Sequence, residues 1–130
     1  MSKSEEKIIQ LLKQGDYKFE REKRFSDLKH GLYRFDFMIK RGRSFCLLEY
    51  NGEQHYQPIS KFYSSRAEFK SAQGRDRRKI SYCLANRIPL YIIPYWELDS
   101  IHSAADLFKD KYKARDRWKN DTDWKKFNSK

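Results

Sequence analysis

The sequence predicts an α/β fold in which a small mixed central β-sheet is flanked by helices. Residues 32–40 and 44–50 carry strand-like apolar patterns on either side of a tight "RGR" turn, which is typical of a hairpin. Residues 88–95, "IPLYIIPY", are a run of β-branched and apolar residues between prolines, as in a buried strand. Residues 4–14 and 64–86 have helical patterns. Helices and strands thus alternate along 130 residues, a length that suits one domain.

The first helix is expected over residues 4–14, "SEEKIIQLLKQ", and a weak amphipathic strand follows at 17–25. Ser4 is the expected N-cap, and Glu5 and Glu6 favour the positive end of the helix dipole. The apolar side chains of this helix recur at helical spacing and predict its buried face: Ile8, Ile9, Leu11 and Leu12.

In the hairpin, alternation along 32–40 predicts one apolar face, made of Tyr33, Phe35, Phe37 and Ile39. Asp36 is expected on the opposite face with Arg34 and Met38, and "SFCLLEY" at 44–50 is the partner strand.

The second half of the chain is expected to hold a helix over 64–86, interrupted near Gly74, then the strand at 88–95 and a last helix over about 101–113. Residues 1–100 would form the core, and the basic helix and tail at 101–130 would belong to the same domain. Cys46 and Cys83 lie in apolar contexts without metal-type spacing, so both are expected as reduced core residues.

Positive charge is concentrated in two segments of the chain. The net charge is +11, and residues 60–87 carry eight basic and two acidic side chains, whereas 108–130 carry nine and four. Localised positive charge predicts a polyanionic partner, most often a nucleic acid. A membrane partner is not expected, because the sequence has neither a transmembrane span nor a signal-peptide core, and a cytoplasmic location follows.

Two carboxylates stand in the hairpin where they could share a cation. Asp36 lies mid-strand and Glu49 near the end of the next strand, so an antiparallel pairing can place both on one face. They would repel each other unless a cation lay between them, and magnesium prefers such oxygen ligands. In a basic protein this favours metal-assisted phosphodiester hydrolysis. For Asp36 the alternative is a surface carboxylate paired with Arg34.

A histidine and a further acid follow this pair. His55 lies six residues beyond Glu49, after a glycine turn, which favours a role as general base or in protonating the leaving group. Asp76 stands in "GRDRRK", where local charge neutralisation on a helix is the alternative to a functional role.

The combination of "RFDF", "EYNGEQHY" and "GRDRRKISYCLANRIPLYIIPY" resembles the restriction-endonuclease-like superfamily over about residues 4–95. More narrowly it is similar to the branch that contains very short patch repair endonucleases and certain phage homing endonucleases. That branch has a scattered Glu, Asp, x, His, Asp signature. The central "EYNGEQHY" after "RFDF" is the specific part of the resemblance, and the outer positions are not specific.

The resemblance implies a role for each matching residue. Asp36 and Glu49 would be metal ligands, and His55 would activate water or assist the leaving group. Asp76 would orient His55 or hold a water near the metal. The family's N-terminal helix glutamate falls on Glu5, with Glu6 as a near-equal alternative.

The commoner nuclease motif has a lysine two residues after its second acid, and here that position is Asn51. The sequence therefore lacks the lysine that the commoner motif has at this position, and this favours the branch whose signature contains a histidine.

Several residues are candidates for nucleic-acid contact. Gln54 would hydrogen-bond water or phosphate. Trp118, in the basic C-terminal segment, would stack on bases, with packing of the last helix as the alternative. Four helix cations around Asp76 would meet the DNA backbone: Arg75, Arg77, Arg78 and Lys79.

These observations predict an Mg2+- or Mn2+-dependent DNA endonuclease without a small-molecule cofactor, encoded by a phage or mobile element and acting in the cytoplasm of a bacterial host. A monomer with one catalytic centre would nick, and double-strand cleavage would need a homodimer or two events. The alternatives are a non-catalytic nucleic-acid-binding module of a larger complex and a structure-selective junction nuclease.

Overall fold

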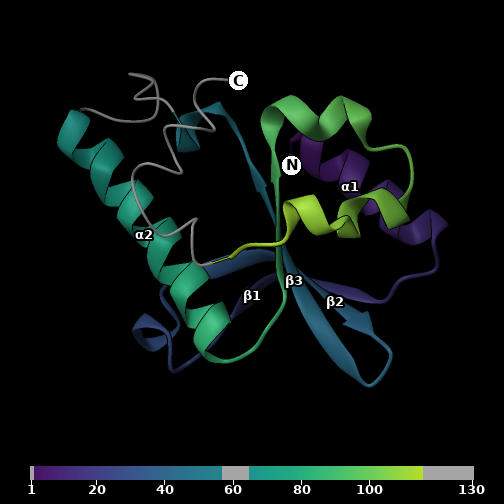
Figure 1. Cartoon of the computed structure of the whole chain (residues 1–130), viewed down its shortest axis with the longest axis horizontal. Coiled ribbons are helices and arrows are strands. Elements are labelled where there is room, and N and C mark those ends of the chain that lie inside the picture. Colours follow the sequence, from purple (N-terminus) through teal and green to yellow (C-terminus); the bar gives the residue numbers. More distant parts are fainter. Residues whose placement is uncertain (1, 57–64, 116–130) are drawn as a thin grey trace.

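The computed structural model describes residues 2–56 and 65–115 as a mixed α/β fold, which confirms the predicted small mixed sheet with helices (Figure 1). Its sheet has the strand order β1-β2-β3-β4. The first three strands are antiparallel neighbours, whereas β4 is parallel to β3. The sheet is therefore mixed, with the bounds β1 (Phe19–Arg24), β2 (Arg34–Arg41), β3 (Ser44–Asn51) and β4 (Leu90–Pro94).

Two α-helices accompany the sheet, α1 (Lys3–Gln14) and α2 (Arg66–Ala85). The cap of α1 is Ser2 rather than the predicted Ser4, because the Ser2 hydroxyl accepts the Glu5 N–H at 3.1 Å. The predicted interruption of α2 near Gly74 is wrong, since the helix runs through that residue. Short 3-10 turns complete the described chain: η1 (Lys29–Gly31), η2 (Glu53–His55), η3 (Tyr95–Ser100), η4 (Ala104–Phe108) and η5 (Asp110–Tyr112).

The sheet separates two apolar cores, with α2 over one face and α1 and the C-terminal 3-10 turns over the other (Figure 1). Leu47 faces the α2 side with Ile80, and Leu48 faces the α1 side with Leu12. Because both faces are covered, β3 and β4 are apolar almost throughout, as is typical of strands that carry parallel pairing. A buried polar side chain in β3 therefore needs a partner, and the strand has two, Glu49 and Asn51.

The alternation of side chains along β2 between the two faces of the sheet is interrupted at Asp36, so the residues before and after it pack on opposite faces. Tyr33 and Phe35 pack in the core on the α2 side, whereas Phe37 and Ile39 pack on the α1 side. The predicted single apolar face is therefore wrong. Backbone pairing of β2 with β3 runs from Arg41–Ser44 to Phe37–Leu48. At the next position the side chain of Asp36 accepts the Tyr50 N–H at 2.9 Å.

The predicted C-terminal helix at 101–113 is also wrong. Its region contains η4 and η5, separated by Lys109 in an extended conformation (φ −64°, ψ 143°). The chain then returns to the edge of the sheet, where the Ala114 N–H donates to the Leu90 carbonyl at 2.8 Å and Lys113 bridges Tyr91. These bonds require extended backbone, which a continuous helix could not supply.

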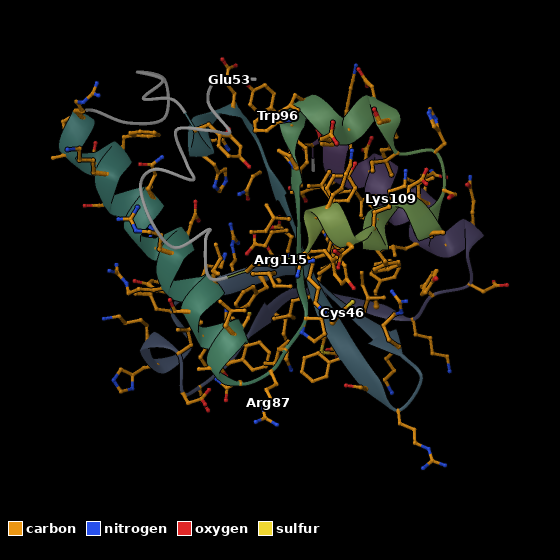
Figure 2. All side chains as sticks on the ribbon, viewed as in Figure 1. Cys46, Glu53, Arg87, Trp96, Lys109 and Arg115 are labelled. Atoms are coloured by element: carbon orange, nitrogen blue, oxygen red, sulfur yellow. The ribbon has the colours of Figure 1, made fainter. Side chains whose placement is uncertain are left out.

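The parallel strands β3 and β4 have their C-terminal ends at the same end of the sheet. Figure 2 shows Glu53, just after β3, and Trp96, just after β4, at this same end of the molecule, with Arg87 at the opposite end. Cys46 and Cys83 are buried and free, as predicted. Across the two described ranges, no helix is both long and apolar enough to cross a membrane.

Candidate active site

A cavity of about 560 Å³ lies between α2 and the divergent ends of β2 and β3. It gathers residues from four elements that are far apart in the sequence. One stripe of α2 lines it at helical spacing, through Ala72, Arg75, Asp76 and Lys79. The other predicted site residues in its lining are Asp36, Glu49, Gln54 and His55.

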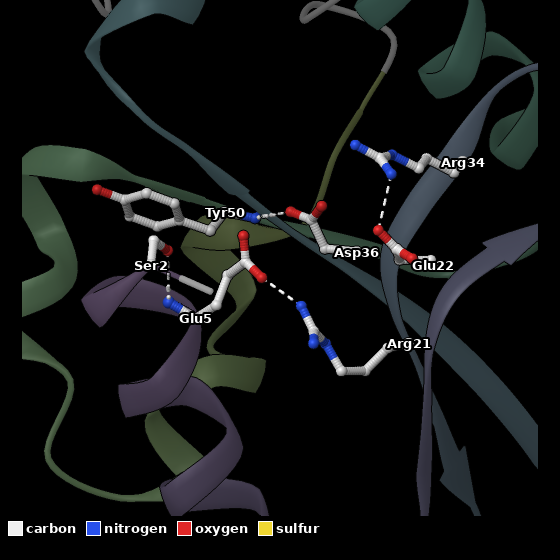
Figure 3. A network of polar contacts seen from close by, with 7 residues as sticks. All are labelled: Ser2, Glu5, Arg21, Glu22, Arg34, Asp36 and Tyr50. Atoms are coloured by element: carbon white, nitrogen blue, oxygen red, sulfur yellow. Dashed lines mark hydrogen bonds and ion pairs between the residues drawn. The ribbon is translucent and has the colours of Figure 1, made fainter.

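Asp36 occupies the point where β2 and β3 separate. Its Oδ2 accepts the backbone N–H of Tyr50 at 2.9 Å, in place of a main-chain acceptor (Figure 3). This bond fixes the carboxylate at the cavity wall. On the other neighbouring strand, Glu22 has a left-handed backbone (φ 56°) beside this point, which adds to the local distortion of the sheet.

Glu49 is buried, with 7% of its surface exposed, and its carboxylate forms an ion pair with the Lys79 ammonium. Burial, with a smaller contribution from the charge of Asp36, raises the pKa of Glu49 above 4.5, and the charge of Lys79 opposes this rise. Burial lowers the pKa of Lys79, but the charge and hydrogen bond of Glu49, together with the charges of Asp76 and Asp36, outweigh burial and leave the pKa raised. This rise requires an ionised Glu49. Because the ammonium lies directly against Oε1, we take the ion pair as the resting state.

Lys79 was predicted from the sequence to meet DNA phosphates, but its side chain is only 14% exposed. Its ammonium lies 4.9 Å from the centre of the Phe35 ring, so an aromatic face and a carboxylate both hold it. The structure thus brings a lysine to the second acid from α2, although the position two residues after Glu49 is Asn51. Lys79 stands three residues after Asp76, so the two side chains share one stripe of α2.

His55 and Asp76 form the second polar pair of the cavity. His55 Nδ1 lies 2.9 Å from Asp76 Oδ2, which leaves Nε2 as the nitrogen for a water or a phosphate. Burial lowers the pKa of His55, but the hydrogen bond and charge of Asp76 and the charge of Glu49 outweigh it and raise the pKa above 6.5. Gln73, not identified from the sequence, is buried and donates to the His55 carbonyl at 3.4 Å, so it helps hold η2 on α2.

The raised pKa of His55 predicts a pH-dependent contribution to stability. A pKa raised on folding stabilises the protein fully below the unfolded value of 6.5, and this is lost as pH rises through the folded pKa. Asp76→Asn should therefore lower the unfolding free energy by about 1.5–3 kcal/mol near pH 6 and by less near pH 9. Urea denaturation at both pH values measures this, and an equal loss at both would contradict a charged pair.

Glu5 lies outside this cavity lining and forms an ion pair with Arg21 (Figure 3). Glu6 lines a separate groove with Arg21. Figure 3 also shows Arg34 donating to Glu22, at 2.7 Å, so Arg34 pairs with a strand neighbour rather than with Asp36. The predicted alternative for Asp36, a surface pair with Arg34, is therefore not the arrangement found.

The predicted DNA-contact residues divide between the cavity and its surroundings. Arg75 lines the cavity, whereas Arg78 donates from Nε to the Tyr33 hydroxyl at 3.1 Å and lies over that ring. Arg77 is half-buried on α2 outside the lining. Trp118 falls outside the described residues.

The possible metal ligands are two carboxylates. In residues 2–56 and 65–115, no three His, Cys, Asp or Glu side chains are grouped as a ready ligand set. Asp36 and Glu49 nevertheless suit magnesium, which commonly takes one or two carboxylates and completes its shell with waters and phosphate oxygens.

One rim of the cavity is a strained loop that carries an exposed leucine. Lys29, His30 and Gly31 all have left-handed backbones (φ 48°, 54° and 78°), a conformation that costs about 1–2 kcal/mol for each non-glycine residue. Leu32 follows, 70% exposed, and lines the same cavity as Asp36.

Comparison with known proteins gives little beyond this geometry. No family model matches the chain, and no solved structure matches it. "Uncharacterized protein 307L" of Invertebrate iridescent virus 6 is 40% identical over 48 residues, which is 37% of this chain. The match spans about a quarter, 24%, of the viral protein's own length.

Proposed function

We propose that this protein is a metal-dependent DNA endonuclease with a restriction-endonuclease-like core. The observation that carries the proposal is the meeting of two strand carboxylates, a His–Asp pair and a buried lysine around one cavity. The net charge of +11 supports a polyanionic substrate, and Arg75 on the same stripe of α2 brings positive charge to the cavity wall.

Asp36 and Glu49 would hold Mg2+ or Mn2+. Both are hard oxygen donors on the same cavity, and the ammonium beside Glu49 indicates that this position favours positive charge. When bound, such an ion polarises a phosphate and neutralises its developing charge.

Lys79 supplies positive charge from the protein itself. Glu49 and the Phe35 ring restrict its ammonium to one place in the cavity, so little rotamer freedom is lost when a phosphate oxygen arrives. A preorganised cation stabilises the charge that develops on the scissile phosphate. Lys79 on α2 would thus take the role that the commoner motif gives to a lysine at the position of Asn51.

His55 transfers the proton. Asp76 holds Nδ1, so Nε2 faces the reacting groups, and in its neutral form the ring accepts a proton from the attacking water. The protonated ring, favoured by Asp76, donates to the leaving oxygen. Gln73 positions the ring through the His55 carbonyl.

The test is a nicking assay on supercoiled plasmid with Mg2+ or Mn2+, and with EDTA as the metal-free comparison. The wild-type chain should convert supercoiled to nicked circles, and His55→Gln should slow this by about 10²–10⁴-fold, the usual contribution of a positioned acid–base group. Glu53→Gln is the matched control, because Glu53 is exposed on the same 3-10 turn, and it should cut at the wild-type rate.

Equal rates for wild type and His55→Gln would remove His55 from the mechanism. If the wild type binds DNA but cleaves neither DNA nor RNA with either metal, the chain is a nucleic-acid-binding module instead. Cleavage confined to branched DNA would make it a junction nuclease with the same chemistry.

A further inference from the structure

The loop at the rim of the cavity holds one apolar side chain out toward solvent. Among the described residues, Leu32 is the one large hydrophobic residue that is exposed to solvent, with 70% of its surface accessible. It also lines the cavity that contains Asp36 and His55, so an exposed apolar side chain stands at the wall of the candidate active site.

The backbone beneath Leu32 is fixed on both sides. Arg24 Nη1 donates to the carbonyls of Gly31 and Leu32, at 2.8 and 3.0 Å. The N–H groups of the same two residues donate back into the turn, to the Leu28 and Lys29 carbonyls at 3.1 and 3.0 Å. The two main-chain bonds close the turn on itself, and the two bonds from Arg24 tie it to the end of β1.

The residues that flank the turn anchor it to the core. Leu28 before it and Tyr33 after it are both buried. Arg78 on α2 binds the Tyr33 hydroxyl at 3.1 Å, which ties the rim to the helix that carries Asp76. Three successive left-handed residues need such constraints to persist, so Leu32 projects from a rigid support.

The chemistry around Leu32 selects the partner. Lys29 and His30 beside it are exposed and suited to a phosphate backbone. A single leucine is too small for an apolar protein interface, which needs a cluster of anchors. An apolar side chain beside exposed hydrogen-bond donors to phosphate is the arrangement by which DNA-binding proteins insert a wedge between stacked bases.

We propose that Leu32 is a wedge that enters a base step of duplex DNA and unstacks it beside the cleavage site; this rests on the proposed nuclease function. Asp36 is four positions after Leu32, and an extended chain spans at most about 3.6 Å per residue, so their Cα atoms lie within about 14 Å of each other. At about 3.4 Å per base pair, the unstacked step lies within about four base pairs of the cut.

The test measures unstacking and binding separately, with short duplexes that carry 2-aminopurine at successive positions. The full chain is used in an Asp36→Asn background, which keeps the duplex uncut. Binding should raise 2-aminopurine fluorescence several-fold at one or two adjacent positions. Adding Leu32→Ala should abolish the rise, whereas Leu32→Met, which retains an apolar wedge, should preserve it. Because Leu32 is exposed, neither change should disturb folding, and circular dichroism checks this.

Fluorescence anisotropy of the labelled duplexes gives the affinity of each variant. DNA binding without a fluorescence rise at any position would overturn the wedge and leave the nuclease proposal intact. An equal rise with Leu32→Ala would also overturn it. Absence of both binding and plasmid nicking in the wild type would overturn the nuclease proposal and the wedge together.

Discussion

Replacing Asp36 by asparagine should abolish nearly all cleavage while leaving the fold close to the wild type. Asparagine retains an oxygen that can accept the Tyr50 N–H, so the junction of β2 and β3 keeps its hydrogen bond. It loses the negative charge needed to hold a divalent cation. We expect cleavage to fall by about 10²–10³-fold, the size of loss seen when a charge-stabilising group is removed from an active site. Single-turnover nicking measures this.

Asp36→Ala separates the two roles of this residue. It removes the acceptor as well as the charge, and should lower the unfolding free energy by about 1–3 kcal/mol because the Tyr50 N–H loses its partner. If Asp36→Asn cut at the wild-type rate, Asp36 would be a purely structural residue and the metal assignment would be wrong.

Lys79→Met should affect both stability and activity. The substitution retains a long apolar stem against the Phe35 ring but leaves the Glu49 carboxylate buried without its counter-charge. Breaking a buried pair in this way costs about 3–5 kcal/mol. Urea denaturation should show that loss, and nicking should fall by about 10²-fold or more because the preorganised cation is gone.

The stability lost in Lys79→Met should depend on pH in a defined direction. Burial raises the pKa of Glu49 above its ordinary value of 4.5, and removal of Lys79 takes away the charge that opposes this rise. Between 4.5 and the raised pKa, the folded carboxyl of the variant holds a proton that the unfolded one releases, so the variant's stability falls as pH rises. The loss should therefore be smaller near pH 5 than near pH 8.

The double variant Glu49→Gln/Lys79→Met supplies the control for folding. It removes both charges and should recover much of the lost stability, because no uncompensated carboxylate remains. Its nicking should stay low. Recovery of activity together with stability would mean that the pair serves the fold alone.

Local patterns allowed much of the site to be predicted from the sequence. Glu49 follows an apolar strand, where an acid needs a reason to be buried, and His55 follows it after a glycine, so both could be singled out. The structure places both on one cavity with Asp36 and Asp76. Whether these residues cut DNA stays a prediction.

The parts that could not be predicted depend on tertiary placement. Lys79 was one of several cations in "GRDRRK", and only the docking of α2 on the sheet separates it from its exposed neighbours. The change of side in β2 arises because the Asp36 carboxylate replaces a main-chain acceptor, which a two-residue period cannot foresee. The C-terminal segment has a helical pattern, but its bonds to β4 outweigh that local preference.

The parallel pairing of β3 with β4 has a consequence for the order in which the site forms. β2 and β3 are joined by a tight turn, and the Asp36–Tyr50 contact spans only 14 residues. The His55–Asp76 contact spans 21 residues and requires α2 to cross over the sheet before β4 can pair. Contacts that close longer loops cost more chain entropy and generally form later. We therefore expect the two acids to meet early on the folding route, and the histidine's partner and the lysine to reach them only when the crossover closes.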